Sequence, residues 1–462
     1  MDASYLFAQN FAKVKYEDLP PKVVEETKKQ VLDYIGVALA GFMQDGAKEV
    51  RELAIELGGA PQSSIIGTEA KVPAPHAAQA NASVAHSLDF DDVHEAAIMH
   101  PGVITIPTSF AMAEYKGGLS GKNFIQNVAV GGDMISRMGL ATRPGESNIH
   151  QYGWHFTTLN GYMTAAAVAS NVLGLSEEKM LYAMGIAYHQ SAGNGQAVKD
   201  SALTKRLGPG FSVRGGIHAS LLAEKGVTGS VNSMEGVNGY YKVYHMGDYS
   251  RDILIGELGT RFESENITIK PYPCCRGTHP SIDAALYLVK EHNIEAENIK
   301  SIMIWCGKGT QGLLGEPLEI KAKPRVVVDS QFSLAWGVSC ALTRKKVGLS
   351  EFTEESIRDP KILETASKVG VAYDPAFDTG GLEPVRVAVT MKDGQTFSKT
   401  METATGSPER PITFKECEAK FRDCINYAQR RLPAENAEKI VKMIKDLEQV
   451  KDIRKLIDLL CW

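Results

Sequence analysis

The stretch PPKVVEETKKQVLDYIGVALAG, residues 20–41, decides the fold. It begins with prolines, which favour the first turn of a helix, and it stops at a glycine, which favours a helix end. Between these ends, apolar residues recur at the spacing of one helical face: Val24, Val31, Ile35 and Leu39. The stretch is therefore predicted to be a long helix whose apolar face packs into a core.

The same helical pattern extends over most of the chain on either side of this stretch. Ala-rich, amphipathic segments separated by glycine breaks cover residues 103–116, 157–173, 177–190 and 215–225. The pattern changes near residue 266, since residues 299–307 are rich in β-branched side chains and predict a strand. Two alternating runs in VRVAVTMKDGQTFSKTM, 385–401, flank an Asp-Gly pair and predict a hairpin. After Pro408 the pattern is helical again.

These changes predict the domain organisation. At 462 residues the chain exceeds the size of one ordinary hydrophobic core, so two domains are expected. The fold class is mainly α, with a helical domain built from residues 1–265 and 406–462 and an α+β domain at 266–405.

Composition limits the cellular context and the partners. Hydrophobic residues make up 44% of the chain, and no run approaches the roughly 18 apolar residues of a membrane span. No export signal is visible at the start, and seven irregularly spaced cysteines do not form a disulfide framework, so a cytoplasmic location is expected. A net charge of -5 argues against nucleic acid as a partner, and a local basic pocket must hold any anionic ligand.

The densest group of titratable residues is HSLDFDDVHEAAIMHP, residues 86–101, between two predicted helices. Carboxylates beside imidazoles suit acid/base chemistry, because each shifts the pKa of the other towards the working range. Asp89, Asp92 and His100 are candidates here. A capped polar loop is the structural alternative, and a metal site is disfavoured because neither HExxH nor an EF-hand spacing occurs.

Two further segments add charged candidates. His155 in WHFTT precedes a predicted helix that Thr157 or Thr158 would cap, so an anion could bind at the free amides of the helix start. Lys205 and Arg206 lie in TKRLGPG, 204–210, where a Gly-Pro turn is predicted to present basic groups to carboxylates. A solvated surface position is the expectation for Arg206.

A fourth segment, IKPYPCCRGTHPSIDAA at 269–285, combines a prolyl turn with several reactive side chains: Lys270, Tyr272, Cys275, Arg276 and His279. Adjacent cysteines have the wrong spacing for a zinc knuckle, and no C-x-x-C supports an iron-sulfur cluster. The thiols are either packing residues or a second proton carrier. No nucleotide fingerprint, P-loop or G-x-S-x-G occurs, so no cofactor is predicted.

Together these segments resemble the MmgE/PrpD family, which includes 2-methylcitrate dehydratase, cis-aconitate decarboxylase and iminodisuccinate epimerase. The resemblance is carried nearly end to end by LDYIGVALAG, HSLDFDD followed by HP, WHFTT, LTKRLGPG, EGVNGYY, IKPYPCCRGTHPSIDAA and DSQFSLAWGVSCAL. It implies a large helical domain from both chain ends, a smaller α+β lid and a homodimer. It also implies catalytic roles without a metal for Asp89, His100, His155, Lys205 and Lys270, and the substrate-binding candidates are Asp92, Tyr272, Cys275, Arg276 and His279.

The implied activity is proton abstraction or delivery at the carbon next to a carboxylate of a small di- or tricarboxylic acid. Dehydration of the 2-methylcitrate type is the first expectation, and epimerisation or decarboxylation are the alternatives. Val93 replaces the threonine of the cis-aconitate decarboxylase pattern, and YPCCRG replaces an FPAHL-type stretch, so a dicarboxylate remains open. A metabolite-binding protein without catalysis is the alternative from another class.

Overall fold

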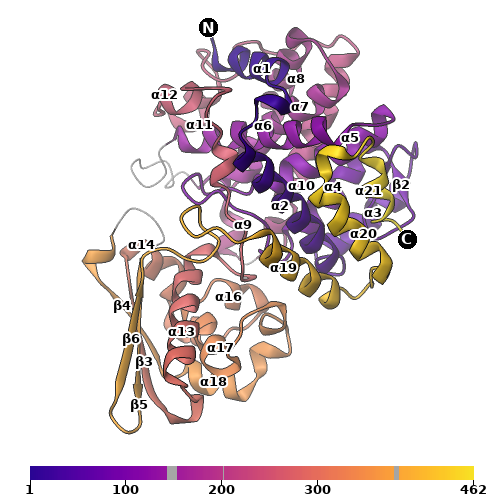
Figure 1. The fold of residues 1–462 in the computed structure, drawn as a ribbon. Coiled ribbons are helices and arrows are strands. Elements are labelled where there is room, and N and C mark those ends of the chain that lie inside the picture. Colours follow the sequence, from indigo (N-terminus) through magenta and orange to yellow (C-terminus); the bar gives the residue numbers. More distant parts are fainter. Residues whose placement is uncertain (143–152, 201, 379–383) are drawn as a thin grey trace. The chain divides into compact units, whose positions relative to one another are not determined.

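The computed structural model describes residues 1–142, 153–200, 202–378 and 384–462 (Figure 1). Within these ranges the chain divides into two compact units. The first contains Met1–Ile269 and Thr413–Trp462, and the second contains Lys270–Ile412. No helix of the described residues is long and apolar enough to cross a membrane.

The first unit is helical apart from one short pair of strands, β1 (Ser63–Ser64) and β2 (Lys71–Val72). Its helices from the N-terminal part of the chain are α1 (Ala3–Lys13), α2 (Pro21–Ala40), α3 (Ala47–Leu57), α4 (Ala74–His86), α5 (Gly102–Lys116), α6 (Gly121–Leu140), α7 (Phe156–Leu173), α8 (Glu177–Gln190), α9 (Gln196–Lys199), α10 (Thr204–Glu224), α11 (Tyr240–His245) and α12 (Arg251–Ile255). The C-terminal part adds α19 (Phe414–Tyr427), α20 (Ala434–Lys445) and α21 (Arg454–Asp458).

Helix α2 confirms the prediction made from residues 20–41, with Pro21 in its first turn and Gly41 at its end. It is buried on more than one face, because α19 returns from the C-terminal part of the chain and packs against it. Gly36 permits this approach, since a Cβ atom there would lie 3.2 Å from the Cα of Phe421. The two ends of the chain therefore share one helical core.

Helix α10 corrects the predicted Gly-Pro turn. Residues 204–210 form its first turns, with Pro209 inside the helix. Pro209 is the sixth residue of α10, beyond the first four unpaired amides, so the helix gives up one main-chain hydrogen bond there. Gly208 and Gly210 have no side chain, so α10 packs closely on Thr158 of α7 and Ser83 of α4. The prediction failed because these glycines serve helix packing and do not break the helix.

The second unit contains a four-stranded sheet in the order β4-β3-β5-β6. Its strands are β3 (Ile299–Cys306), β4 (Val369–Tyr373), β5 (Val385–Met391) and β6 (Thr396–Met401), and its helices are α13 (His279–His292), α14 (Lys308–Thr310), α15 (Leu318–Ala322), α16 (Val327–Gln331), α17 (Leu334–Arg344) and α18 (Pro360–Ala366). Strands β5 and β6 are the predicted hairpin, while β3 pairs in parallel with β4. Helix α13 packs on β5 and β6 (Figure 1). The hydrophobic core of the unit includes Trp336 and Ile304.

Candidate active site

The candidate site is built on the loop between α4 and α5, residues 87–101. Two backbone pairings fix its shape, one between His94 and Met99 and one between Val93 and Thr268. Asp89 adopts a left-handed backbone conformation with φ of 53°, which Asp tolerates better than most residues. The loop thereby places successive carboxylates in different surroundings.

Asp91 lies between two imidazoles, and one of its oxygens serves both. Its Oδ2 is 2.7 Å from Nδ1 of His86 and 3.0 Å from Nδ1 of His100. Burial opposes ionisation, but the neighbouring His100 and His86 hold the pKa of Asp91 well below its ordinary value. Burial in turn lowers the pKa of His86 to about 4. At neutral pH the group is therefore a carboxylate that accepts a hydrogen bond from neutral His86.

The protonation of His100 follows from a second contact. Its Nδ1 is 2.7 Å from the backbone oxygen of Asp92, and a carbonyl oxygen only accepts hydrogen bonds. The proton of the neutral ring therefore lies on Nδ1, and Nε2 carries the free lone pair. The backbone N–H of His100 donates to Oγ1 of Thr157, which ties the end of the loop to α7.

His155 caps the start of α7, so the predicted caps at Thr157 and Thr158 are wrong. Both threonines lie in the first turn, where their hydroxyls contact histidines, and Oγ1 of Thr158 is 2.8 Å from Nδ1 of His155. The ring of His155 is centred 6.3 Å from that of His86. Burial, with a further contribution from Lys205, lowers the pKa of His155 well below its ordinary value. His155 is therefore neutral and available as a base.

Lys205 and His155 line the same cavity. The ammonium of Lys205, in the first turn of α10, is 2.6 Å from Oδ1 of Asp89. The cavity has a volume of about 210 Å³, and its polar lining includes Thr158 and Asn194 beside these two side chains. Such a space suits a small ligand, and the cation in its wall favours an anionic one.

Asp92 and Arg206 have structural partners. Both oxygens of Asp92 accept from the backbone N–H of Gly102, at 3.0 and 3.1 Å, so this carboxyl binds the N-terminal turn of α5. Burial and the nearby Asp91 raise the pKa of Asp92 well above its ordinary value. Arg206 is buried and donates to the backbone oxygen of Asp45 at 2.8 Å, which corrects its predicted solvated position.

The C-terminal part of the chain also holds the loop of residues 87–101. Lys420 on α19 donates to the backbone oxygen of Phe90 at 2.7 Å and forms a buried ion pair with Asp33 of α2 at 2.5 Å. Phe90 stands between Asp89 and Asp91 in the sequence. The contact therefore fixes the backbone that carries both carboxylates.

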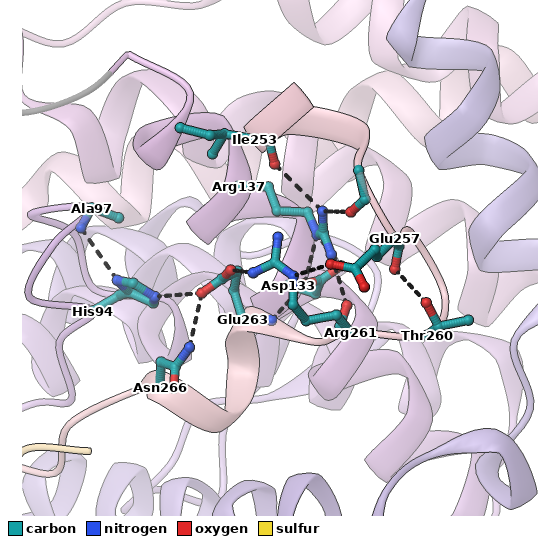
Figure 2. A network of polar contacts seen from close by, with 11 residues as sticks. His94, Ala97, Asp133, Arg137, Ile253, Glu257, Thr260, Arg261, Glu263 and Asn266 are labelled. Atoms are coloured by element: carbon teal, nitrogen blue, oxygen red, sulfur yellow. Dashed lines mark hydrogen bonds and ion pairs between the residues drawn. The ribbon is translucent and has the colours of Figure 1, made fainter. Parts of the chain in front are cut away.

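A network of polar contacts around His94 and Glu263 also holds the loop (Figure 2). His94 Nε2 is 3.4 Å from Oε2 of Glu263, and this hydrogen bond, with others, lowers the pKa of Glu263 to about 2. The backbone N–H of Glu263 donates to Asp133, which forms a fully buried ion pair with Arg137. Arg137 donates to the backbone oxygens of Gly256 and Arg261, and so orders the segment that carries Glu263 (Figure 2).

Comparison with protein families now adds to this geometry. The MmgE/PrpD N-terminal domain matches residues 6–252, and the MmgE/PrpD C-terminal domain matches residues 272–449. The chain belongs to the MmgE/PrpD family. This finding confirms the resemblance seen in the sequence motifs.

Several relatives within the MmgE/PrpD family share most of their length with this chain. It is 26% identical to a cis-aconitate decarboxylase of Aspergillus terreus, over 96% of this chain and 93% of the relative. It is 25% identical to the cis-aconitate decarboxylase-like protein oryM of Aspergillus oryzae, over 97% and 95%. It is 27% identical to the human cis-aconitate decarboxylase, over 98% and 93%. The relatives are lyases, and they give no support to the epimerase alternative.

The remaining predicted residues of this MmgE/PrpD chain belong to the second unit and are described there by themselves: Lys270, Tyr272, Cys275, Arg276 and His279. Lys270 is buried. Within the unit, the hydroxyl of Tyr272 donates to Asp283 at 2.7 Å, and Arg276 donates to the backbone oxygens of Ala404 and Thr405.

His279 and Cys275 also have contacts inside the second unit. Nε2 of His279 is 3.2 Å from the backbone oxygen of Cys274, and its ring lies edge-on to Tyr272 with centroids 5.1 Å apart. The backbone N–H of Cys275 donates to the oxygen of Gln331 at 2.8 Å. Burial and the adjacent Asp283 raise the pKa of Tyr272 well above its ordinary value.

Sequence reasoning missed His86 and Asp91 as site residues, although both lie in the segment that it singled out. The signal was their spacing: His86 ends a helix and Asp91 follows five positions later, so a tight loop returns the carboxylate to the imidazole. His86, Asp91 and His100 also offer three ligand atoms within 4.8 Å of one another, as a metal site would. The contact of His100 Nδ1 with a carbonyl oxygen requires a proton on that nitrogen, which favours a hydrogen-bonded group.

Proposed function

We propose that this chain is a metal-independent acid/base lyase that decarboxylates a small di- or tricarboxylic acid of the cis-aconitate kind. One observation carries the proposal: an imidazole and an ammonium, those of His155 and Lys205, line one small cavity. The names of the relatives support decarboxylation. Dehydration, the first expectation from the sequence, has no such support and becomes one outcome of the test.

The chemistry needs a proton and a fixed cation. When the bond to the departing carboxylate breaks, carbon dioxide leaves and the electron pair passes to the carbon framework, which must then accept a proton. An imidazolium at His155 or His100 donates this proton and is left neutral. Lys205 binds a remaining carboxylate and stabilises the negative charge that develops, while Asp89 orients the ammonium. We assign a second carboxylate contact to Lys270.

The low pKa of His155 fits this role once the substrate is bound. In the free protein its burial favours the neutral ring. A bound carboxylate beside the ring favours the charged form and raises its pKa. Binding of the anion thus recruits the proton that the reaction consumes.

Incubation with a panel of di- and tricarboxylic acids in deuterated buffer, followed by NMR, tests the proposal. The panel includes cis-aconitate, 2-methylcitrate and an unsaturated dicarboxylate. We expect loss of carbon dioxide from one acid, with deuterium at a carbon next to a carboxylate. Water loss or inversion without loss of carbon dioxide would replace decarboxylation by dehydration or epimerisation. Binding of an acid without turnover would indicate a metabolite-binding protein.

Variants assign the roles. His155→Ala is expected to suppress deuterium incorporation. Lys205→Met is expected to reduce kcat/KM on the order of tenfold to a hundredfold, the usual effect of losing one charge-assisted contact. Lys225→Met, at the exposed end of the same helix, is the matched control. Unchanged kinetics in both site variants would contradict the assignment. The family resemblance also leads us to propose a homodimer, which light scattering tests.

A further inference from the structure

We propose that Asp91 and His86 form a positioning pair for His100, in which Asp91 supplies the counter-charge for the protonated ring and His86 holds Asp91 in place. The inference rests on the proposed function, because it assumes that His100 exchanges a proton with the substrate. Asp91 was no part of the predicted site, and Asp89, the catalytic candidate in the same loop, is paired with Lys205.

One oxygen of Asp91 is shared by two imidazoles. His86 and His100 approach the same atom, Oδ2 of Asp91, at 2.7 and 3.0 Å. Their rings lie edge-to-face with centroids 4.8 Å apart. A carboxylate oxygen accepts more than one hydrogen bond, so both rings can donate to it at once. Any rotation of the Asp91 carboxylate would break both contacts, and His86 therefore fixes the position of the charge beside His100.

The two acceptors of His100 approach the same nitrogen and differ in charge. The backbone oxygen of Asp92 lies 2.7 Å and Oδ2 of Asp91 lies 3.0 Å from Nδ1, and neither oxygen can donate, so both hold the proton on Nδ1. The Asp91 carboxylate also adds a negative charge, which favours the imidazolium over the neutral ring.

The three side chains of this group differ in their exposure to solvent. Within the part of the chain that the structure describes, His86 and Asp91 are almost fully buried, while the side chain of His100 remains 13% exposed. Nε2 of His86 and Oδ1 of Asp91 have no hydrogen-bond partner among those residues. Only the ring of His100 reaches the outside of this group. The arrangement therefore has one imidazole to exchange protons and one to hold the carboxylate.

Other titratable groups surround His100. Asp92 is in the same loop, His155 begins α7, and Lys205 lies on α10. The ammonium of Lys205 disfavours a further positive charge nearby. The Asp91 carboxylate, at hydrogen-bond distance from the His100 ring, offsets it.

The test compares the wild type with Asp91→Asn, which keeps the size of the side chain and removes its charge. In protein labelled with ¹⁵N-histidine, with the His100 signal assigned from a His100→Gln variant, NMR follows the Nδ1–H proton of the ring. We expect this proton signal to move upfield in Asp91→Asn, because the ring then loses a charged hydrogen-bond acceptor. In turnover, kcat is expected to fall about 10²- to 10⁴-fold with little change in KM.

His86 is tested with a pair of variants. The amide nitrogen of asparagine occupies roughly the place of Nδ1, so His86→Asn retains a donor to Asp91, whereas His86→Leu has none. We expect His86→Asn to keep a kcat and a His100 Nδ1–H signal closer to those of the wild type than His86→Leu. The exposed Asp423→Asn on α19 is the control for removal of a carboxylate. Circular dichroism checks that each variant is folded.

The outcomes separate this inference from the proposed function. If the wild type turns over an acid, but Asp91→Asn retains the wild-type kcat and the wild-type Nδ1–H signal of His100, the positioning pair is overturned and the function stands. If the wild type acts on no acid, yet the Nδ1–H signal of His100 moves in Asp91→Asn, the pair stands and the proposed function falls. Equal loss in His86→Asn and His86→Leu would remove His86 from the pair.

Discussion

Replacement of Lys420 by methionine should loosen the helical unit and the site together. Its ammonium is 2.5 Å from Oδ1 of Asp33 and 2.7 Å from the backbone oxygen of Phe90, and it lies 3.7 Å from the centre of the Phe90 ring. The exposed fractions of the Lys420 and Asp33 side chains are 6% and 1%. Lys420→Met therefore removes this positive charge from beside the buried Asp33 carboxylate and this donor from the Phe90 carbonyl.

The expected cost follows from these contacts. Removing one partner of a buried ion pair typically costs about 3–5 kcal/mol, because the other charge stays desolvated. The lost hydrogen bond to Phe90 adds about 1 kcal/mol. Replacing both charged groups costs less than replacing one, since no unpaired charge remains. We therefore expect Lys420→Met to be more destabilising than the double variant with Asp33→Leu.

Hydrogen exchange followed by mass spectrometry measures this effect within one unit, which matters because a chain with two units need not unfold in a single step. Peptides from α2, α19 and residues 87–101 should exchange faster in Lys420→Met, by about 10²-fold or more where exchange reports the opening equilibrium. Lys415→Met, exposed on the same helix, is the control. Wild-type exchange in these peptides, or a double variant that is less stable than the single one, would refute the reasoning.

Three further predictions use other parts of the chain. Extended chelation should leave activity unchanged. If chelation removed activity and one divalent metal restored it, the group formed by His86, Asp91 and His100 would be reinterpreted as a metal site. His245 is fully buried, and burial lowers its pKa to about 4, so the unfolded chain takes up its proton first as the pH falls. Stability should therefore decrease from about pH 6.5 towards pH 4, by up to about 3 kcal/mol, and His245→Phe should flatten this dependence in urea titrations. A Cβ atom at Gly208 would overlap the Thr158 hydroxyl, so Gly208→Ala should lower kcat, whereas Gly309→Ala, with open space around its Cβ, should not.

The elements that sequence predicted well are those whose own residues suffice to specify them. Helix α2 has proline at its start, glycine at its end and one apolar face, and the β5–β6 hairpin has Asp393 and Gly394 between alternating strands. The first turns of α10 were missed because Gly208 and Pro209 are normally helix breakers. Their role depends on α7 and α4, which lie far away in the sequence, so local propensity was overridden by packing.

The site divides in the same way. The density of His and Asp in residues 86–101 was visible in the sequence, but the role of each residue depends on loop geometry that spacing does not reveal. Asp89, Asp91 and Asp92 look alike in DFDD, yet one pairs with Lys205, one holds two imidazoles and one binds the start of α5. Such assignments require the left-handed turn at Asp89, which sequence alone does not establish.

The discontinuity of the helical unit has a physical consequence at this loop. Elements from different parts of the chain hold it, among them the end of α4, the segment carrying Glu263, and α19, which begins after residue 412. Helix α19 reaches the main chain between Asp89 and Asp91, through Lys420 and Phe90. A carboxylate that must keep two imidazoles at hydrogen-bond distance tolerates little movement, because these bonds weaken steeply with misalignment. The return of the C-terminal segment to α2 therefore does more than complete a core, since it fixes the backbone on which the candidate acid/base group depends.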